Sequence, residues 1–411
     1  MRILHTSDWH LGKKLYRENR IVEQEQFLKW LLAEIEDNHI EVLIIAGDIF
    51  DVPNPPNEAH KLYNDFLNHA SKLCEAIIII SGNHDSGDFL KATKSFTEEK
   101  NIYIFDKLEP NKADNQISIK INQQSIRFTC LPYFRNYELF HYHNEMIKEE
   151  KKDNWRLDTL KHLLKIEDNS IPNIAISHHA FGNYSATGSE HTLSLSGLES
   201  LPINLFDGYD YVALGHIHQY QNISQDPLAY YTGSPIAMRF SERKKKAYNL
   251  INIDENNNFE IIKKEIPIFR EILQISTDSK NYIHEIKEKL QDINSPLLPF
   301  IEIKIKMLSS LSNMSETIKE LCEKNNCKLL NIIPLIEYED KDKETSIDIQ
   351  NLSPVELFEV YYKNKYPQAQ LNETLKGKFI QLLDEINRLI IPGRIDPKNE
   401  CHIGYKDMYV C

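Results

Sequence analysis

The chain carries near its start the stretch Thr6-Ser7-Asp8-Trp9-His10-Leu11-Gly12, and the rest of the fold is organised around it. It follows an apolar-leaning run, Arg2-Ile3-Leu4-His5, that predicts a first β-strand. Asp8 and His10 therefore come where this strand ends. Because alternate residues of an extended segment point the same way, we expect their side chains to converge. A carboxylate and a neutral imidazole at one point suit Mn²⁺, Fe²⁺ or Zn²⁺.

Four later strand ends carry polar groups of the same kind. The apolar runs at 42–46, 76–80, 174–177 and 211–214 are typical of buried strands. The groups that follow these runs are Asp48, then Asn83 and His84, then His178 or His179, then His216 and His218. His178 is favoured over His179 because it directly follows its strand. Strands that alternate with helices and end in polar residues predict an α/β layered fold with its site along one edge.

The bulk composition is that of a globular protein with room for two or three domains, at 411 residues, 41% hydrophobic and 27% charged. No apolar run approaches the roughly 18 residues of a membrane-spanning helix, and the N-terminus lacks a signal-peptide pattern, so a cytoplasmic location is expected. Six cysteines without CxxC spacing fit free thiols in a reducing compartment. The net charge of −13 argues against broad wrapping of nucleic acid, but not against a local basic groove.

The pattern changes after about residue 267. From 268 to 337, strand and helix spacing alternates without Gly-His clusters, which predicts a small second domain, and 338–352 is a charged, apolar-poor linker. Ser353-Pro354-Val355-Glu356 predicts a helix start, with an N-cap Ser, Pro at the first position and Glu closing a capping box. A pair of amphipathic helices over 353–388 is expected to dock on a partner, with packing on the core as the alternative. No role is assigned to the tail, 389–411.

The ordered set D-x-H, G-D, G-N-H-D, H and G-H-x-H resembles the calcineurin-like metallophosphoesterase superfamily over about residues 1–265. The resemblance implies a β-sandwich flanked by helices and a site for two divalent cations. It implies the following roles: Asp48 bridges the ions, Asp8, His10 and His218 complete one ligand set, and Asn83, His178 and His216 complete the other. His84 is implied as the general acid that protonates the leaving oxygen. Glycines at 47, 82 and 215 are expected to permit tight turns and close approach to the ions.

Longer stretches narrow the resemblance to the SbcD family of nuclease subunits. The stretches are Met1–Gly12, Ala213–His218, Tyr231-Thr232-Gly233-Ser234-Pro235 and Phe240-Ser241-Glu242. The resemblance implies a nuclease core over 1–267, a small α+β capping domain over 268–337 and, over 353–388, a helical pair that binds an SbcC-like ATPase. It further implies Mn²⁺, 3′→5′ exonuclease action on duplex DNA and endonuclease action on single strands or hairpins, in DNA repair, replication and recombination. A homodimer of the nuclease subunit within a heterotetramer is expected.

Two basic stretches are predicted to hold DNA phosphates, with a solvated loop as the alternative for each. They comprise Lys13, Lys14 and Arg17, and then Arg243, Lys244 and the lysines up to Lys246. A rival function is a phosphomonoesterase or cyclic-nucleotide phosphodiesterase on the same core, which would need neither the capping domain nor the helical pair. A non-catalytic scaffold is a second rival, but such a protein should have lost ligands that are all present here.

Overall fold

The computed structural model describes residues 1–87, 89–90, 101–144, 154–187, 200–242, 245–291, 293–307, 314–336, 354–365, 371–372 and 375–379. The chain divides into two compact units, Met1–Glu337 and Tyr338–Cys411. The predicted linker (338–352), the tail (389–411) and two of the predicted DNA contacts, Arg243 and Lys244, lie outside the described residues. No helix in the described ranges is long and apolar enough to cross a membrane.

The first unit contains two six-stranded sheets. The first sheet has the order β14-β13-β1-β4-β5-β6. Its strands are β1 (Arg2–Thr6), β4 (Val42–Ala46), β5 (Ala76–Ile80), β6 (Ile102–Phe105), β13 (Lys246–Ile253) and β14 (Phe259–Ile266). The four neighbouring strands β1, β4, β5 and β6 pair in parallel, so their carboxyl ends meet at one edge. β13 runs antiparallel to both β1 and β14.

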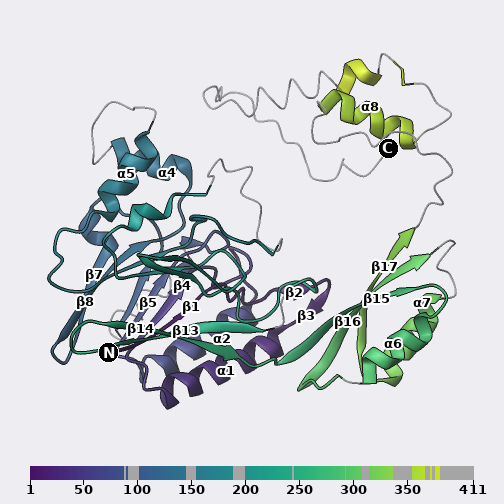
Figure 1. Cartoon of the computed structure of the whole chain (residues 1–411), viewed down its shortest axis with the longest axis horizontal. Coiled ribbons are helices and arrows are strands. Elements are labelled where there is room, and N and C mark those ends of the chain that lie inside the picture. Colours follow the sequence, from purple (N-terminus) through teal and green to yellow (C-terminus); the bar gives the residue numbers. More distant parts are fainter. Residues whose placement is uncertain are drawn as a thin grey trace. The chain divides into compact units, whose positions relative to one another are not determined.

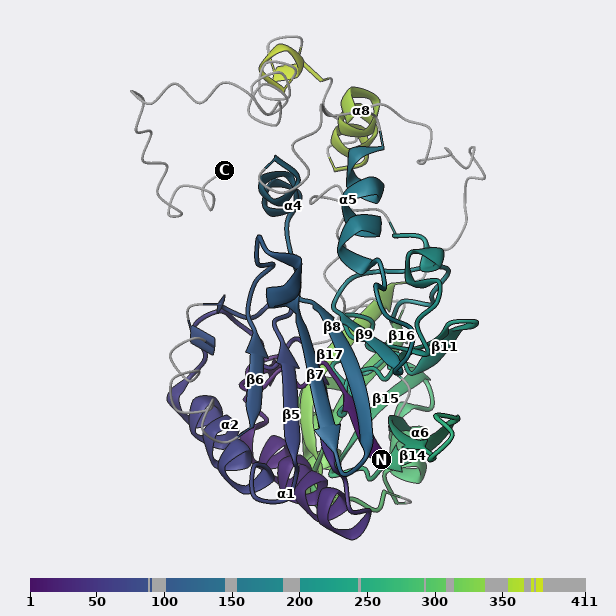
Figure 2. The ribbon, with the colours of Figure 1, turned by 90° about the vertical axis from the view of Figure 1, so that its left-hand side faces the viewer.

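The second sheet has the order β11-β12-β10-β9-β8-β7. Its strands are β7 (Gln116–Ile121), β8 (Gln124–Leu131), β9 (Asn173–Ser177), β10 (Tyr211–Leu214), β11 (Gln221–Gln225) and β12 (Leu228–Tyr231). The four neighbouring strands β8, β9, β10 and β12 pair in parallel. β7 and β11 close the two edges in antiparallel pairs. The edge strands β6 and β7 lie at the same side of the sandwich (Figure 2) and line one cavity of about 240 Å³.

The two sheets pack face to face because their central strands are apolar on both sides. In β4, Val42 and Ile44 belong to the core between the sheets, together with Phe128 and Ile176 of the second sheet. The alternate residue Leu43 instead packs under the helices α1 (Ile21–Asp37) and α2 (Asn57–Ala70). The helices α4 (Asn136–Tyr142) and α5 (Trp155–Leu164), with the short 3₁₀ helix η5 (Ile203–Phe206), cover the second sheet. The predicted β-sandwich flanked by helices is confirmed (Figures 1 and 2).

The predicted second domain contains a three-stranded parallel sheet with the order β15-β16-β17. It is built from β15 (Arg270–Asp278), α6 (Tyr282–Gln291), β16 (Leu297–Met307), α7 (Met314–Lys324) and β17 (Lys328–Ile336). Parallel neighbours need crossover connections, which α6 and α7 supply on one face of the sheet (Figure 1). Ile286 and Ile318 of these helices share a separate core with the strand residues Ile301 and Ile303.

A small hairpin of the sandwich contacts this three-stranded sheet. Its strands are β2 (Lys14–Leu15) and β3 (Glu18–Asn19), which the sequence did not predict. Tyr16, between them, donates a hydrogen bond to Glu302 and accepts one from Asn331 at 2.9 Å. Glu18 forms an ion pair with Lys328 at 2.7 Å. The second 3₁₀ helix, η2 (Lys112–Asn115), precedes β7 and completes the regular elements described for this unit.

The second unit contains α8 (Pro354–Lys365), which begins at the proline that the sequence predicts as the first helical position. Residues 375–379 are also helical, within the range predicted for the second helix of the pair. Phe358 stacks on Phe379 with ring centroids 4.1 Å apart, and Lys376 forms an ion pair with Glu359 at 2.5 Å. These contacts join the described parts of the two predicted helices.

Candidate metal centre

All five predicted strand ends meet at one edge of the sandwich. β1, β4 and β5 of the first sheet lead into Asp8, Asp48 and Asn83, and β9 and β10 of the second sheet lead into His178 and His216. Parallel strands of both sheets therefore deliver polar groups to the same place, as the layered fold predicts. Three groups of side chains have their potential ligand atoms within 4.8 Å of one another: Asp8, His10 and His218, then Asp8, Asp48 and His178, and then His10, Asp48 and His84.

The D-x-H pair does not converge in the way that the sequence predicts. β1 ends at Thr6, and Asp8 and His10 have φ angles of 54° and 45°, in the left-handed region, so the segment is not extended. Their backbone amides instead donate to the carbonyls of Gly47 and Asp48, each at 3.0 Å. The loop after β4 therefore sets the direction of both side chains. Asp48 and His216 also have positive φ, at 51° and 93°.

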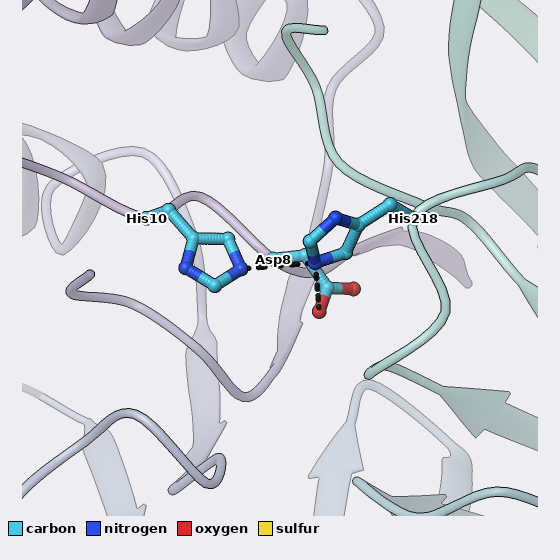
Figure 3. A group of neighbouring side chains, drawn as sticks. All are labelled: Asp8, His10 and His218. Carbon is cyan, nitrogen blue, oxygen red and sulfur yellow. Dashed lines mark hydrogen bonds and ion pairs between the residues drawn. The ribbon is translucent and has the colours of Figure 1, made fainter. Parts of the chain in front are cut away.

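The first group consists of Asp8, His10 and His218 (Figure 3). The Nε2 atoms of the two histidines lie 3.1 Å apart, and His218 Nε2 is 3.9 Å from Asp8 Oδ1. All three side chains are buried. Asp8 also accepts hydrogen bonds from Ser7 Oγ at 2.5 Å and from the backbone amide of His216 at 3.0 Å. These partners hold the carboxylate toward the two imidazoles.

Asp48 connects this group to the second one. Its Oδ2 lies 3.5 Å from Nε2 of His10 and 3.3 Å from Nε2 of His178. The other ring nitrogen of His178 donates to the carbonyl of Ala46 at 2.7 Å, which directs Nε2 toward the aspartates. His216 Nδ1 donates to Asn83 Oδ1 at 3.0 Å, and its ring lies 5.4 Å from that of His178. The structure thus brings all seven predicted ligands together.

The choice between His178 and His179 follows from which way each ring points. His179 is buried on the other side of the strand end, stacked on Tyr133 at 5.1 Å and 4.1 Å from the ring of Phe134. Burial lowers the pKa of His179 to about 3, so this histidine is neutral. His178 alone of the two faces Asp48, and we keep it as the candidate ligand.

The electrostatics of the centre favour a bound cation. Burial alone would lower the pKa of His178, but the carboxylate of Asp48 outweighs it and raises the pKa to about 9. Burial opposes ionisation of Asp48, yet His178 and His10 keep the pKa of this carboxyl well below its usual range. Burial lowers the pKa of His10, and it lowers that of His216 to about 4. The two buried aspartates therefore hold one positive charge, a proton on His178, and a bound metal ion would supply that charge instead.

The donor set and the space around it fit divalent metal ions. Among the described residues, the buried His178 Nε2 has Asp48 Oδ2 at 3.3 Å but makes no well-aligned hydrogen bond. A buried nitrogen without such a partner is costly unless a ligand satisfies it. Carboxylate oxygens with imidazole nitrogens suit Mn²⁺, Fe²⁺ or Zn²⁺. The buried Asp/His cluster is therefore compatible with divalent metal binding.

His84, the predicted general acid, lies beside the cluster on the loop after β5. Its backbone amide donates to Asp48 Oδ1 at 2.9 Å, and its Nδ1 donates to the carbonyl of Asp51 at 2.7 Å. The ring lies 4.9 Å from that of His10. With Nδ1 held by a carbonyl, Nε2 is the nitrogen that can exchange a proton with a substrate.

Asp51 was not predicted from the sequence, although it follows Asp48 closely. Its Oδ1 lies 3.5 Å from His10 Nδ1 and 2.7 Å from Lys13 Nζ. Burial opposes ionisation, but His10 and Lys13 lower the pKa of Asp51 to about 2. Lys13, a predicted DNA contact, is thus paired with Asp51, the residue that lies behind the candidate ligand His10. An isolated Asp three residues after a G-D pair has no spacing that would distinguish it from a turn residue.

The remaining predicted phosphate contacts fall into two classes. Lys14 and Arg17 are exposed on the β2–β3 hairpin. Lys246 is buried at the start of β13, so the expectation of a DNA contact there is wrong. Its ammonium group is held inside the protein by Glu242 at 2.6 Å. Lys245 is exposed and pairs with Glu265 at 3.2 Å.

The glycines at 47, 82 and 215 stand where the two sheets approach the cluster most closely. A Cβ atom at Gly82 would lie 2.1 Å from Asp48 Oδ1, and one at Gly47 would lie 2.3 Å from His178 Nδ1. At Gly215, a Cβ would lie 1.9 Å from the carbonyl oxygen of Ala46. Any side chain at these positions would displace a candidate ligand or separate the strand ends.

We expect Gly82→Ala to lower the free energy of unfolding by about 1–3 kcal/mol, as overpacking of a rigid site does, and to weaken metal binding. Urea unfolding and metal titration measure the two effects. Gly377→Ala is the matched control, since nothing lies within 4 Å of a Cβ there. It should leave metal binding unchanged and should not lower the free energy of unfolding, because alanine at an exposed helical position is at least as favourable as glycine. Wild-type stability and metal affinity in Gly82→Ala would show that the loop can retreat from Asp48 at no cost.

Comparisons with known proteins agree with the geometry. Residues 1–220 match the family model of calcineurin-like phosphoesterases. The SbcD subunit of nuclease SbcCD from Bacillus subtilis (strain 168) is 29% identical over 397 residues, which cover 93% of this chain and 97% of that protein. Among solved structures, a cold-active protein-tyrosine phosphatase of a psychrophilic Shewanella species matches 63% of this chain and 80% of its own at 11% identity and a TM-score of 0.25. That last likeness is too low to carry an argument.

Proposed function

Because the chain belongs to the calcineurin-like phosphoesterase family, we propose that it is the metal-dependent nuclease subunit of an SbcCD-type complex. The observation that carries the proposal is the convergence of all seven predicted ligands, with His84 beside them, at one edge of the sandwich. The similarity to the SbcD subunit of nuclease SbcCD supports the substrate class, because it extends over almost the full length of both proteins. The reaction would be hydrolysis of DNA phosphodiester bonds.

The proposed cofactor is a pair of divalent cations, with Mn²⁺ the expected metal. Asp8, His10 and His218 would hold one ion, and Asn83, His178 and His216 the other. Asp48 would stand between them, in keeping with its Oδ2 lying 3.5 Å from His10 Nε2 and 3.3 Å from His178 Nε2. When bound, two such ions supply Lewis acidity to the phosphate and lower the pKa of a water nucleophile.

The protein's own groups would supply the proton that the leaving oxygen needs and set the charge that faces the phosphate. His84 keeps its Nδ1 proton bonded to the carbonyl of Asp51, so in its imidazolium form the proton on Nε2 would be the one passed to the leaving oxygen. Burial of Asp8, His10 and Asp48 keeps water from competing for the charges that act on the phosphate. The neutral Asn83 leaves the site less negative than a third carboxylate would, which lowers repulsion of the phosphate.

The experiment that tests this function offers the full-length protein several phosphate esters with Mn²⁺. End-labelled duplex DNA, a single-stranded hairpin, a cyclic nucleotide and p-nitrophenyl phosphate would be compared. We expect cleavage of duplex ends in the 3′→5′ direction and of the hairpin. Hydrolysis of only the monoester or the cyclic nucleotide would replace the proposal with the rival phosphoesterase function, and no hydrolysis of any ester would favour a scaffold.

The exposed Lys14 and Arg17 are the proposed phosphate contacts. Lys14 lines a cavity of about 440 Å³ between the β2–β3 hairpin and the three-stranded sheet, together with Arg239 and Lys304. Cationic side chains around an open cavity suit the backbone of nucleic acid. Lys13 is less suited, since its ammonium group lies 2.7 Å from Asp51.

We expect Lys14→Gln and Arg17→Gln each to weaken DNA binding and to reduce the slope of log affinity against log salt by about 0.9, the value for one lost phosphate contact. Fluorescence anisotropy over a salt series measures both. Lys29→Gln is the control, because Lys29 is a solvent-exposed lysine of α1 paired only with Glu25 in the described residues. An unchanged slope in both variants would place the DNA elsewhere.

An SbcC-like ATPase is the proposed partner, bound through the helical pair at 353–388 and assembled as a heterotetramer on a nuclease homodimer. The exposed Tyr361 and Leu375 give this segment apolar surface for such a partner. Deleting 353–387 should abolish co-purification with the ATPase while Mn²⁺ binding to the remaining chain persists. If the truncated protein still co-purifies with the ATPase, the partner binds elsewhere than on the helical pair.

A further inference from the structure

A buried ion pair lies behind His218, in a part of the sequence for which the proposed reaction has no role. Glu242 ends the motif Phe240-Ser241-Glu242, and its Oε2 lies 2.6 Å from Nζ of Lys246. The two side chains are 0% and 8% exposed. Taking two charges out of water is unfavourable unless further hydrogen bonds offset the loss. The hydrogen-bond partners of the pair therefore indicate its role.

The further contacts described for this pair connect the loop that carries His218 with the segment after β12. Lys246 Nζ donates to the backbone carbonyl of His218 at 3.3 Å and to Ser234 Oγ at 2.9 Å. The amide of Met238 donates to Glu242 Oε2 at 3.0 Å, which holds the carboxylate in place. The amide of Ser234 also donates to the His218 carbonyl, at 3.2 Å. The lysine thus joins the loop after β12 to the backbone of a candidate ligand.

The second carboxylate oxygen of Glu242 stands at the remote side of the His218 ring. Its Oε1 is 3.9 Å from His218 Nδ1, whereas His218 Nε2 faces His10 and Asp8. The same arrangement recurs at His10, whose Nδ1 lies 3.5 Å from Asp51 Oδ1. Both histidines of the first group therefore have a carboxylate behind the ring and direct Nε2 into the cluster.

We propose that Glu242 and Lys246 are positioning residues that orient His218 for metal binding. The inference rests on the proposed function only in taking His218 as a ligand. At 3.9 Å the carboxylate is beyond hydrogen-bond distance, but its negative charge favours the tautomer with the N–H on Nδ1, which leaves the lone pair of Nε2 for the ion. Lys246 holds both Glu242 and the His218 backbone, and it keeps the buried carboxylate neutralised.

The test is calorimetric titration of the metal-free full-length protein with Mn²⁺, without DNA. Glu242→Gln should lower the affinity for one of the two ions by about 10–100-fold and leave the affinity for the other unchanged. A loss of this size is usual when a group that hydrogen-bonds or faces the outer nitrogen of a ligand histidine is removed. His218→Ala should lower the affinity for the same ion further. Adding Glu242→Gln to His218→Ala should cause no additional loss, because the glutamate would act only through that ring. A merely structural effect would remain in the double variant.

Glu265→Gln is the matched control, since Glu265 pairs with the neighbouring Lys245 on the surface. It should bind both ions like the wild type. If Glu242→Gln alone fails to fold, Glu242→Gln combined with Lys246→Met removes both buried charges and carries the same expectation. Wild-type affinity in a folded Glu242 variant, or a loss that persists without His218, would overturn the inference. A protein that binds two ions in this assay but cleaves no DNA would instead refute only the nuclease proposal.

Discussion

Asp48→Asn is expected to abolish tight binding of both metal ions and to lower DNA cleavage by about a thousandfold or more. Asp48 Oδ2 lies between His10 Nε2 and His178 Nε2, one from each predicted ligand set. Loss of its charge removes the anion that would offset repulsion between two cations. Metal ions contribute several kcal/mol of charge stabilisation in such reactions, and about 4 kcal/mol corresponds to a thousandfold change in rate. Calorimetry and a gel assay of duplex cleavage measure the two effects.

The substitution is conservative for the protein itself. Asparagine keeps an oxygen that can accept from the amide of His84, and it tolerates the left-handed backbone at this position. Asp8→Asn is the comparison variant, because the proposal assigns Asp8 to the first ligand set only, although its Oδ1 lies at similar distances from His218 (3.9 Å) and His178 (4.0 Å). This variant should lower the affinity for one ion much more than for the other. If Asp8→Asn removes both ions and Asp48→Asn only one, the bridging role belongs to Asp8.

His84→Ser is expected to lower cleavage of DNA by about 10²–10⁴-fold, the range for loss of a general acid, while both ions remain bound. The ring is held at Nδ1 by the carbonyl of Asp51 and lies 4.9 Å from the ring of His10. Without it, the leaving oxygen departs as an alkoxide. His69→Ser is the control, because His69 is exposed on α2 and bonds only to its own helix within the described residues.

A substrate with a good leaving group separates this role from metal binding. His84→Ser should lose far less activity on a p-nitrophenyl phosphodiester than on DNA, because p-nitrophenolate leaves without a proton. His84 also lies in one group with His10 and Asp48, so it could instead be a ligand. Loss of an ion in His84→Ser, with equal loss of activity on both substrates, would assign it that role.

The sequence predicted the positions of the candidate ligands because each follows a continuous apolar strand, and such strands are recognisable one at a time. Val42–Ala46 and Ala76–Ile80 are buried at every residue, as their composition predicts. The predicted route by which Asp8 and His10 converge was wrong, since their placement depends on hydrogen bonds to Gly47 and Asp48 in the loop after another strand, β4. Periodicity within one segment carries no information about such bonds.

The supporting residues were beyond sequence reasoning for a related reason. Asp51 lies behind the ring of His10, and Glu242 lies behind that of His218, although each pair is well separated along the chain. Their proximity arises only from the pairing of the sheets. Lys246 looked like part of a solvated basic run, yet it begins a buried strand. Charge in a run of lysines does not reveal which member turns inward, because tertiary packing decides that.

The left-handed backbone at Asp8, His10, Asp48 and His216 has a consequence for how this protein can change over evolutionary time. Each such conformation costs a non-glycine residue on the order of 1 kcal/mol, which the surrounding hydrogen bonds must offset. A lineage that no longer needed the chemistry would gain stability by placing glycine there. The presence of two aspartates and two histidines in this conformation is what we expect where reactivity outweighs stability. A drift toward glycine at these four positions would therefore identify relatives that have become inactive.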